Sequence, residues 1–273
     1  MKKLILSVAF VIFAAAACRE KKPAEFTRLG FYTPYQGYME KLNGKVESVT
    51  EKAYWVIPEG DSLIKGPRVS KIQLDSVGYT YDYIVVFDSA GYPVTSTTIN
   101  EIDRPINIWK LYKENGLLAR GEFISDDTLR YTQKIICDDD GIPLIYNGYD
   151  AMTDTLVQKI ESRGSCMNDS ITVQYFNYRG EPGVKYVYHF DEKGLMTRLD
   201  AYRNGMLISS QQMTYTDKGF VEEFKSLDKD KNVISSAVSS YSKYDEHGNW
   251  TKSYTRDAKG FTMLFERVYT YFE

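Results

Sequence analysis

Residues 244–250 read Tyr-Asp-Glu-His-Gly-Asn-Trp, an order of residue types that is typical of a β-hairpin turn. Asp245 stands at the first turn position, where its carboxylate can accept hydrogen bonds from the turn amides. Gly248 supplies the positive φ that closes a type I turn followed by a bulge. Because Tyr244 and Trp250 flank this turn, they can face each other across an antiparallel ladder.

The same pattern returns, less completely, at six further turns along the chain. Their turn residues are Asp88, Gly91, Gly116, Asp138, Gly141, Asp191, Gly194, Gly219, Asp257 and Gly260. Glycines are spaced by 25 residues from position 91 to 116, from 116 to 141 and from 194 to 219. A fixed spacing of this length predicts a repeat architecture. The Asn204-Gly205 pair predicts that two-residue turns close the other end of the hairpins.

The segments between these turns alternate as half-buried strands do. In residues 184–190, one face carries Val184, Tyr186, Tyr188 and Phe190. The 23 tyrosines and 13 phenylalanines favour pleated surfaces with one wet side. Residues 152–160 fit either a helix or a strand. We therefore predict an all-β protein, an antiparallel array of β-hairpin repeats that forms an extended, twisted or curling sheet.

The motif at residues 244–250 resembles the tyrosine-aspartate (YD, or RHS-type) repeat, whose core is Tyr-Asp-x-x-Gly followed by a polar residue. Arginine often follows the glycine in that family, whereas this chain has Asn249. Residues 42–51 (LNGKVESVTE) also resemble the first strand of uncharacterised repeat lipoproteins of Bacteroidetes. The resemblance covers roughly residues 42–273. It implies long hairpins laid side by side as a scaffold, without an enzyme mechanism.

The N-terminus predicts export and lipid attachment. Lys2 and Lys3 precede an apolar stretch of residues 4–17, which at about 1.5 Å per residue is too short to span a bilayer as a helix. Ala17 and Cys18 end this stretch in a sequence that resembles the lipobox of bacterial lipoproteins. We therefore expect a signal peptide at 1–17, a lipid-anchored polar tether at 18–29 and a β-hairpin repeat domain at 30–273.

The expected location is the cell envelope, with the lipid on Cys18 held in the outer membrane. The sequence leaves both the periplasmic and the outward-facing side open. A formal charge of −3, without a clustered basic patch, argues against nucleic acid as a partner. Beyond Cys18, the cysteines at 137 and 166 can form a disulfide in this compartment or stay as buried thiols.

Catalytic and metal-binding patterns are weak. The two histidines, His189 and His247, do not cluster with a nucleophile or with further ligands, so neither a hydrolytic triad nor a zinc site is expected. Residues 138–141 and 228–232 carry oxygen side chains that could suggest calcium, but polar turns explain them better. We expect no cofactor and no metal.

The predicted function is a non-enzymatic binding or scaffolding role for an unknown protein or glycan ligand. Trp55, Trp109 and Trp250 are the candidates for stacking on a sugar, although packing inside the sheet also explains them. The alternative is an envelope carbohydrate-active hydrolase that uses a pair of carboxylates.

Overall fold

A computed structural model describes residues 26–29, 40–60, 62–70, 72–74, 82–138, 143–165 and 170–273. The predicted signal peptide, Ala17 and Cys18 lie outside the described residues, as do Gly141 and Cys166. The strands are β1 (Phe26–Leu29), β2 (Glu40–Asn43), β3 (Val46–Glu59), β4 (Ser62–Arg68), β5 (Tyr83–Phe87), β6 (Pro93–Ile99), β7 (Pro105–Glu114), β8 (Leu117–Ser125), β9 (Thr128–Cys137), β10 (Pro143–Asp150), β11 (Leu156–Ser165), β12 (Ser170–Asn177), β13 (Pro182–Phe190), β14 (Met196–Arg203), β15 (Met206–Tyr215), β16 (Val221–Asp228), β17 (Val233–Tyr244), β18 (Trp250–Asp257) and β19 (Thr262–Tyr271).

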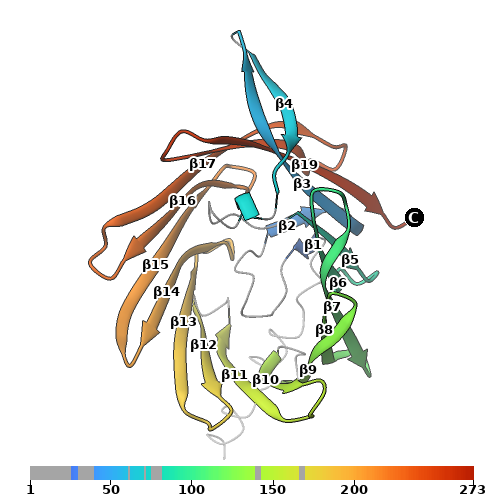
Figure 1. Ribbon diagram of the computed structural model, residues 1–273, viewed down its shortest axis with the longest axis vertical. Coiled ribbons are helices and arrows are strands. Elements are labelled where there is room, and N and C mark those ends of the chain that lie inside the picture. Colours follow the sequence, from blue (N-terminus) through green and yellow to red (C-terminus); the bar gives the residue numbers. More distant parts are fainter. Residues whose placement is uncertain are drawn as a thin grey trace, which may run out of the picture.

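The strands form a closed antiparallel barrel of 16 strands, which are β3 and β5 to β19 (Figure 1). Each strand pairs with its neighbour in sequence, and β19 pairs with β3 to close the ring. The predicted all-β hairpin array is thus confirmed, but the expected open sheet is wrong. Closure pairs the backbone groups that two free edges would leave exposed.

Strand β3 is long enough to pair with two different neighbours on the same side. Its first half pairs with β5 at Ser48–Glu51, and its second half pairs with β4 at Tyr54–Glu59. The β3–β4 hairpin therefore extends beyond the barrel wall (Figure 1). We call the barrel mouth at this hairpin the hairpin end.

The opposite mouth, here called the β2 end, holds the turns at 88–92, 114–117, 191–195, 216–220 and 245–249. The hairpin end holds the turns at 100–104, 126–127, 151–155, 178–181, 204–205, 229–232 and 258–261. Each predicted repeat is a pair of antiparallel strands, so the chain returns to the same end of the barrel after every repeat. Most glycine turns of the predicted repeat therefore lie at the β2 end. Gly260 is the exception, since its turn lies at the hairpin end.

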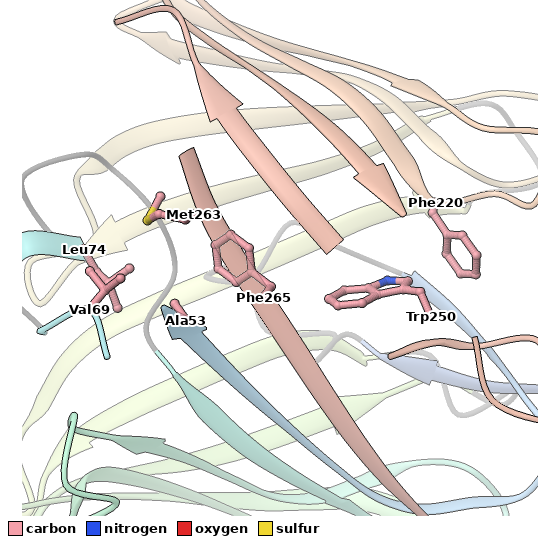
Figure 2. Close-up of a cluster of buried hydrophobic side chains, with 7 residues drawn as sticks. All are labelled: Ala53, Val69, Leu74, Phe220, Trp250, Met263 and Phe265. Atoms are coloured by element: carbon pink, nitrogen blue, oxygen red, sulfur yellow. The ribbon is translucent and has the colours of Figure 1, made fainter. Parts of the chain in front are cut away.

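Two segments pack against the inner face of the wall. Leu42 of β2 packs with Val49 and Val85. Val69 and Leu74 pack with Ala53 and Phe265 at the other end (Figure 2). Both segments lie inside the ring in Figure 1, so the wall residues that they contact point into the barrel. The alternate residues along each strand then point outward.

Two sequence interpretations change with the structure. Residues 26–29, which we assigned to the tether, form β1 and pair with β2. The ambiguous residues 152–160 form a turn followed by the start of β11, which pairs with β10 and β12. Tyr186 and Tyr188 lie on one face, as the alternation predicted, and in the barrel that face points inward.

Candidate functional surfaces

The repeat aspartates hold their turns by the same pair of hydrogen bonds. Asp245 Oδ1 accepts the backbone N–H groups of His247 and Asn249, at 3.0 and 2.9 Å. Equivalent pairs occur at Asp88, Asp191 and Asp257. Gly91, Gly194, Gly248 and Gly260 all have positive φ in these turns. A carboxylate thus satisfies two amides that the ladder leaves unpaired.

Other turns are stabilised by different residues. At 115–116, Asn115 and Gly116 both have positive φ, which defines a two-residue turn without the aspartate. In the turn at 216–220, Thr216 replaces the aspartate, and its hydroxyl accepts the Phe220 amide at 3.2 Å. Sequence inspection missed four further caps, at Asn100, Asp150, Asn177 and Asp228. Asn100, Asp150 and Asp228 lack a glycine three residues further on, and at Asn177 an asparagine stands in place of the aspartate.

Gly248→Val will lower the free energy of unfolding by about 1 kcal/mol or more, because a β-branched residue is strained at positive φ. The φ of Gly248 is 83°, while an added Cβ would lie 3.8 Å from its nearest neighbour, so backbone strain and not a clash causes the loss. Urea denaturation measures the effect. Gly183→Val is the matched control, since Gly183 lies in β13 outside the left-handed region; equal losses for both variants would contradict this assignment.

The turn carboxylates make the fold sensitive to acid. The Asn232 side chain and amide lower the pKa of Asp228, and Thr153 lowers that of Asp150. Burial raises the pKa of Asp88, but its hydrogen bonds to Lys113 and to the Tyr92 amide lower it further, so the net shift is downward. A lowered folded pKa stabilises the fold above the unfolded pKa of about 4, and this stability is lost as the pH falls through the folded pKa.

We therefore expect a melting temperature that is flat between about pH 6 and 8 and falls below about pH 4. Replacing Asp88, Asp150 and Asp228 together by asparagine will lower the melting temperature at pH 7 and reduce the further loss in acid. The melting temperature falls because an amide NH2 cannot accept the hydrogen bonds that Lys113 and Asn232 donate to the second carboxylate oxygen. Asparagine retains the caps, as Asn100 and Asn177 show. An unchanged acid profile in the triple variant would refute this origin of the acid sensitivity.

The most complete repeat unit receives the chain segment that precedes the barrel. Asn249 is fully buried, and its Oδ1 accepts the Asn43 amide at 2.7 Å while its Nδ2 donates to the Asn43 carbonyl at 2.8 Å. Nδ2 also donates to the Tyr271 hydroxyl at 2.9 Å. The His247 ring lies against the Tyr271 ring with centroids 4.1 Å apart, and the histidine remains exposed to solvent. The asparagine that departs from the YD pattern thus fastens β2 to the wall.

A buried ion pair lies across the seam where the barrel closes. Arg267 of β19 and Glu51 of β3 are direct cross-strand partners, with Nε and Oε2 2.6 Å apart. Tyr83 of β5 donates its hydroxyl to Glu51 and accepts a hydrogen bond from Arg267, both at 3.0 Å. The guanidinium also lies 3.9 Å from the Trp250 ring centroid. This row links three neighbouring strands on the inner face.

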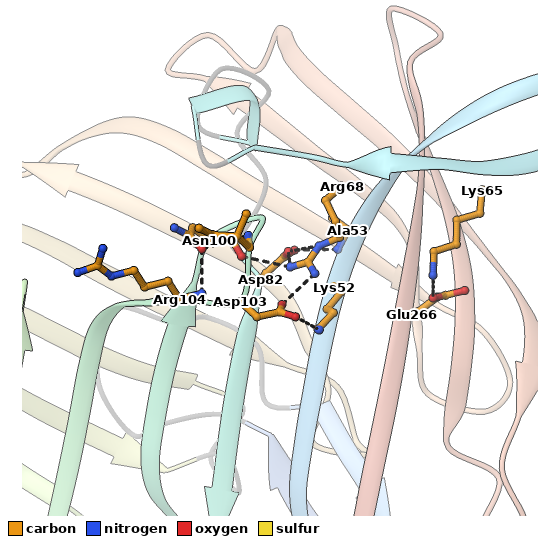
Figure 3. Close-up of polar contacts among 10 residues, drawn as sticks. Lys52, Ala53, Lys65, Arg68, Asp82, Asn100, Asp103, Arg104 and Glu266 are labelled. Carbon is orange, nitrogen blue, oxygen red and sulfur yellow. Dashed lines mark hydrogen bonds and ion pairs between the residues drawn. The ribbon is translucent and has the colours of Figure 1, made fainter.

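A second arginine secures the point at which β3 changes partner (Figure 3). Ala53 lies between the two pairings of β3, and its amide donates to Asp82 Oδ1 at 2.7 Å. Arg68 donates from Nε to Asp82 at 3.0 Å and from Nη1 to Asp103 at 2.9 Å. Burial raises the pKa of Asp82, and Arg68 opposes that shift. The cluster holds the base of the projecting hairpin.

The buried carboxylates do not form a catalytic pair. Among the described residues, Glu51, Asp82 and Asp200 are the buried carboxylates, and each is bound to an arginine. Asp200 also contacts His189 at 3.0 Å and Ser210 at 2.6 Å. Because Asp200 separates the histidine from the serine, this group lacks the serine–histidine contact of a hydrolytic triad. The described part of the chain also holds no group of three potential metal ligands.

Aromatic side chains line part of the inner wall. Trp109, Phe123 and Tyr131 are cross-strand neighbours on β7, β8 and β9, with Trp109 4.9 Å from Phe123 and 6.1 Å from Tyr131. Beside them, Gln133 is fully buried, and its side-chain amide makes no hydrogen bond. Trp250 is also buried, so packing accounts for it.

The outer wall carries many charged side chains, aromatic rings that contact those charges, and scattered exposed aliphatic side chains such as Val238 and Val268. Ion pairs join Arg120 to Glu122, Lys159 to Glu161 and Lys225 to Glu223. Further rings lie under cations on the same face, including Tyr112 under Arg120 at 4.2 Å and Tyr202 under Lys185 at 4.8 Å. Cation–π contact lets an exposed ring remain in water at little cost.

Cys137 forms no disulfide with any residue that the structure describes, and its thiol lies 3.2 Å from the Leu118 carbonyl, to which it donates. Since Cys166 lies outside the described residues, the bridge between them stays a prediction. Asp138 lies at the end of β9, where the turn that follows it is also outside the described residues. No described helix has the length and apolar character needed to cross a membrane.

The fold defines a closed antiparallel barrel whose charged side faces outward. A porin-like protein from Bacteroides uniformis shares this fold, with a TM-score of 0.51 and 9% identity over 82% of this chain and 98% of that chain. Two further structures superpose only weakly. One is a porin-like protein from Bacteroides vulgatus, with a TM-score of 0.30 and 8% identity over 83% of this chain and 99% of that chain. The other is the Photorhabdus luminescens Tc holotoxin pore, with a TM-score of 0.17 and 10% identity over 82% of this chain and 19% of that chain. No family model matches the sequence, and no curated protein is detectably similar. At 9% identity, the first likeness concerns the fold alone.

Proposed function

We propose that this protein is a non-enzymatic lipoprotein of the bacterial cell envelope, anchored through Cys18, whose barrel stands in water and serves as a binding or scaffolding surface. The observation that carries the proposal is the charged outer wall. The lipobox-like sequence before Cys18 accounts for membrane attachment without a spanning segment. The YD-like hairpins supply the scaffold, and the ligand is a protein or a glycan.

A membrane-spanning role fits this wall poorly. Transmembrane barrels carry an apolar outer band about 25 Å tall, and a Lys or Arg at its midplane costs roughly 2–4 kcal/mol. Here the outward positions at mid-strand include Lys159, Lys225 and Glu266. Charged side chains at this height disfavour contact with lipid. A barrel surrounded by water is compatible with charged side chains at these positions.

Cys18→Ser separates the two kinds of membrane association. We expect the variant to move from the membrane fraction to the soluble fraction without detergent, because the lipid is its sole attachment in this proposal. Fractionation and immunoblotting, with metabolic labelling by a radioactive fatty acid, provide the measurement. Cys137→Ser is the matched control and should stay lipidated and in the membrane fraction.

Retention of the unlipidated Cys18→Ser barrel in the membrane fraction would mean that the wall itself holds it there. Lipid incorporation into that variant would show that another residue is the acceptor. Protease digestion of intact and of lysed cells then determines which side of the outer membrane the barrel occupies.

A further inference from the structure

Among the described residues, exposed apolar turn residues are more numerous at the hairpin end of the barrel than at the β2 end. At the β2 end, Phe220 folds inward and is buried, while Tyr92 and Leu117, which also follow turn glycines, are 48% and 43% exposed. At the hairpin end, six of the seven turns listed above carry an apolar side chain, in the turn or directly beside it, that is more than half exposed. These side chains are Ile102, Met152, Tyr178, Met206, Val233 and Phe261, which are between 51% and 85% exposed.

The projecting hairpin continues this apolar rim. Ile57 and Ile64 are paired across the hairpin, and Leu63 lies beside them; all three are exposed. Next to the hairpin base, Trp55 lies 6.4 Å from the exposed ring of Phe261. Exposed apolar side chains that gather at one site of a water-facing protein mark an interaction surface. We call this set the hairpin-end rim.

The rim also has a charge. The seven hairpin-end turns given above, with the strand residue on either side of each, contain ten acidic and six basic side chains, and Glu59 at the tip of the projecting hairpin adds one more acid. An anionic bilayer attracts basic segments, so an acidic rim opposes docking to it. Two copies meeting rim to rim would place like charges together, which is unfavourable. The partner that fits is a protein with basic side chains around an apolar surface.

The predicted anchor leaves this rim free. Strand register places Phe26 beside Asn43, which is bound to Asn249 at the β2 end. Residues 19–25 separate Cys18 from β1 and can extend over about 27 Å. The lipid therefore attaches at the mouth opposite the rim, a step that rests on the proposed function.

We propose that the hairpin-end rim is the docking surface for a basic protein partner of the envelope. The rim supplies apolar contact at its turns, and its carboxylates select the partner by charge. The binding surface is then the mouth with the projecting hairpin and not the charged wall.

Site-specific photo-crosslinking in cells that make the full lipidated protein tests this surface. A photoreactive phenylalanine analogue replaces Ile102 or Met206 on the rim, and Val268 on the outer wall as the control of similar exposure (76%, 69% and 66%). We expect one discrete protein adduct from both rim positions and none from Val268. Glu101→Lys combined with Asp230→Lys should lower the adduct yield by about tenfold, because complementary charge guides the encounter.

The proposal is overturned by any of four results: no adduct from the rim, equal adducts from Val268, an adduct of two copies of this chain, or an adduct with lipid. A yield unaffected by the two charge reversals would overturn selection by charge. Fractionation of the same cells reports the lipid anchor separately, so a failed anchor and a failed rim give different results.

Discussion

Arg267→Met will lower the free energy of unfolding by about 3–5 kcal/mol, because it leaves the buried Glu51 carboxylate without its counter-charge. Both side chains are nearly inaccessible to solvent, at 5% and 8% exposure. The substitution also removes the hydrogen bond to Tyr83 and the contact with the Trp250 ring. Because the pair spans the seam between β19 and β3, barrel closure is weakened directly. Urea denaturation, followed by circular dichroism, measures the loss.

Lys225→Met provides the control, since its ion pair with Glu223 lies on the outer wall with both side chains about a third exposed. Exposed pairs contribute about 0–1 kcal/mol. The double variant Glu51→Gln with Arg267→Met should recover part of the loss, because the uncompensated charge is gone. A loss under 1 kcal/mol for Arg267→Met would mean that the seam does not depend on this pair.

Asn249→Ala will lower the free energy of unfolding by about 2–4 kcal/mol, because it leaves the Asn43 amide and carbonyl without their partners in a buried place. Residue 249 itself is fully buried, and Leu42 beside this contact is fully buried as well. Detachment of β2 would expose that leucine. Hydrogen exchange should therefore show faster exchange at Asn43, in addition to the loss seen in denaturation.

Asn232→Ala is a closely matched control. Asn232 follows Asp228 by four residues, as Asn249 follows Asp245, and its amide is capped in the same way. Its side chain is exposed and bonds only within its own turn, to Asp228 Oδ2. We expect a loss below about 1 kcal/mol for this variant. Equal losses for the two variants would show that turn geometry, and not the contact with β2, explains the effect.

Turn chemistry and strand alternation were readable from the sequence because both are local. An aspartate accepts hydrogen bonds from backbone amides within four residues of itself, and glycine is favoured at these turns because the φ of its own position is positive. The alternation at 184–190 likewise concerns neighbouring residues, and it correctly placed Tyr186 and Tyr188 on one face. The caps at Asn100 and Asn177 were missed because the motif was defined by an aspartate with a glycine at a fixed spacing.

The candidate surfaces were harder to predict, since their residues come together from distant parts of the chain. Arg267 and Glu51 are 216 residues apart, and Asn249 and Asn43 are 206 residues apart. Nothing in residues 244–250 indicates that Asn249 binds β2. The exposed rim could not be predicted from the sequence either, because its side chains belong to turns that come together only at one mouth of the barrel.

The sequence by itself determined the all-β class, the hairpin repeat and the residues that hold its turns. It also carries the lipid-anchor prediction. Only the tertiary structure decided that the sheet closes, which face points inward and which mouth exposes more apolar side chains. An alternating strand has two distinct faces wherever it lies, but which of them meets water depends on the direction in which the whole sheet curls. That direction arises from twist summed over sixteen strands and from the pairing of β19 with β3.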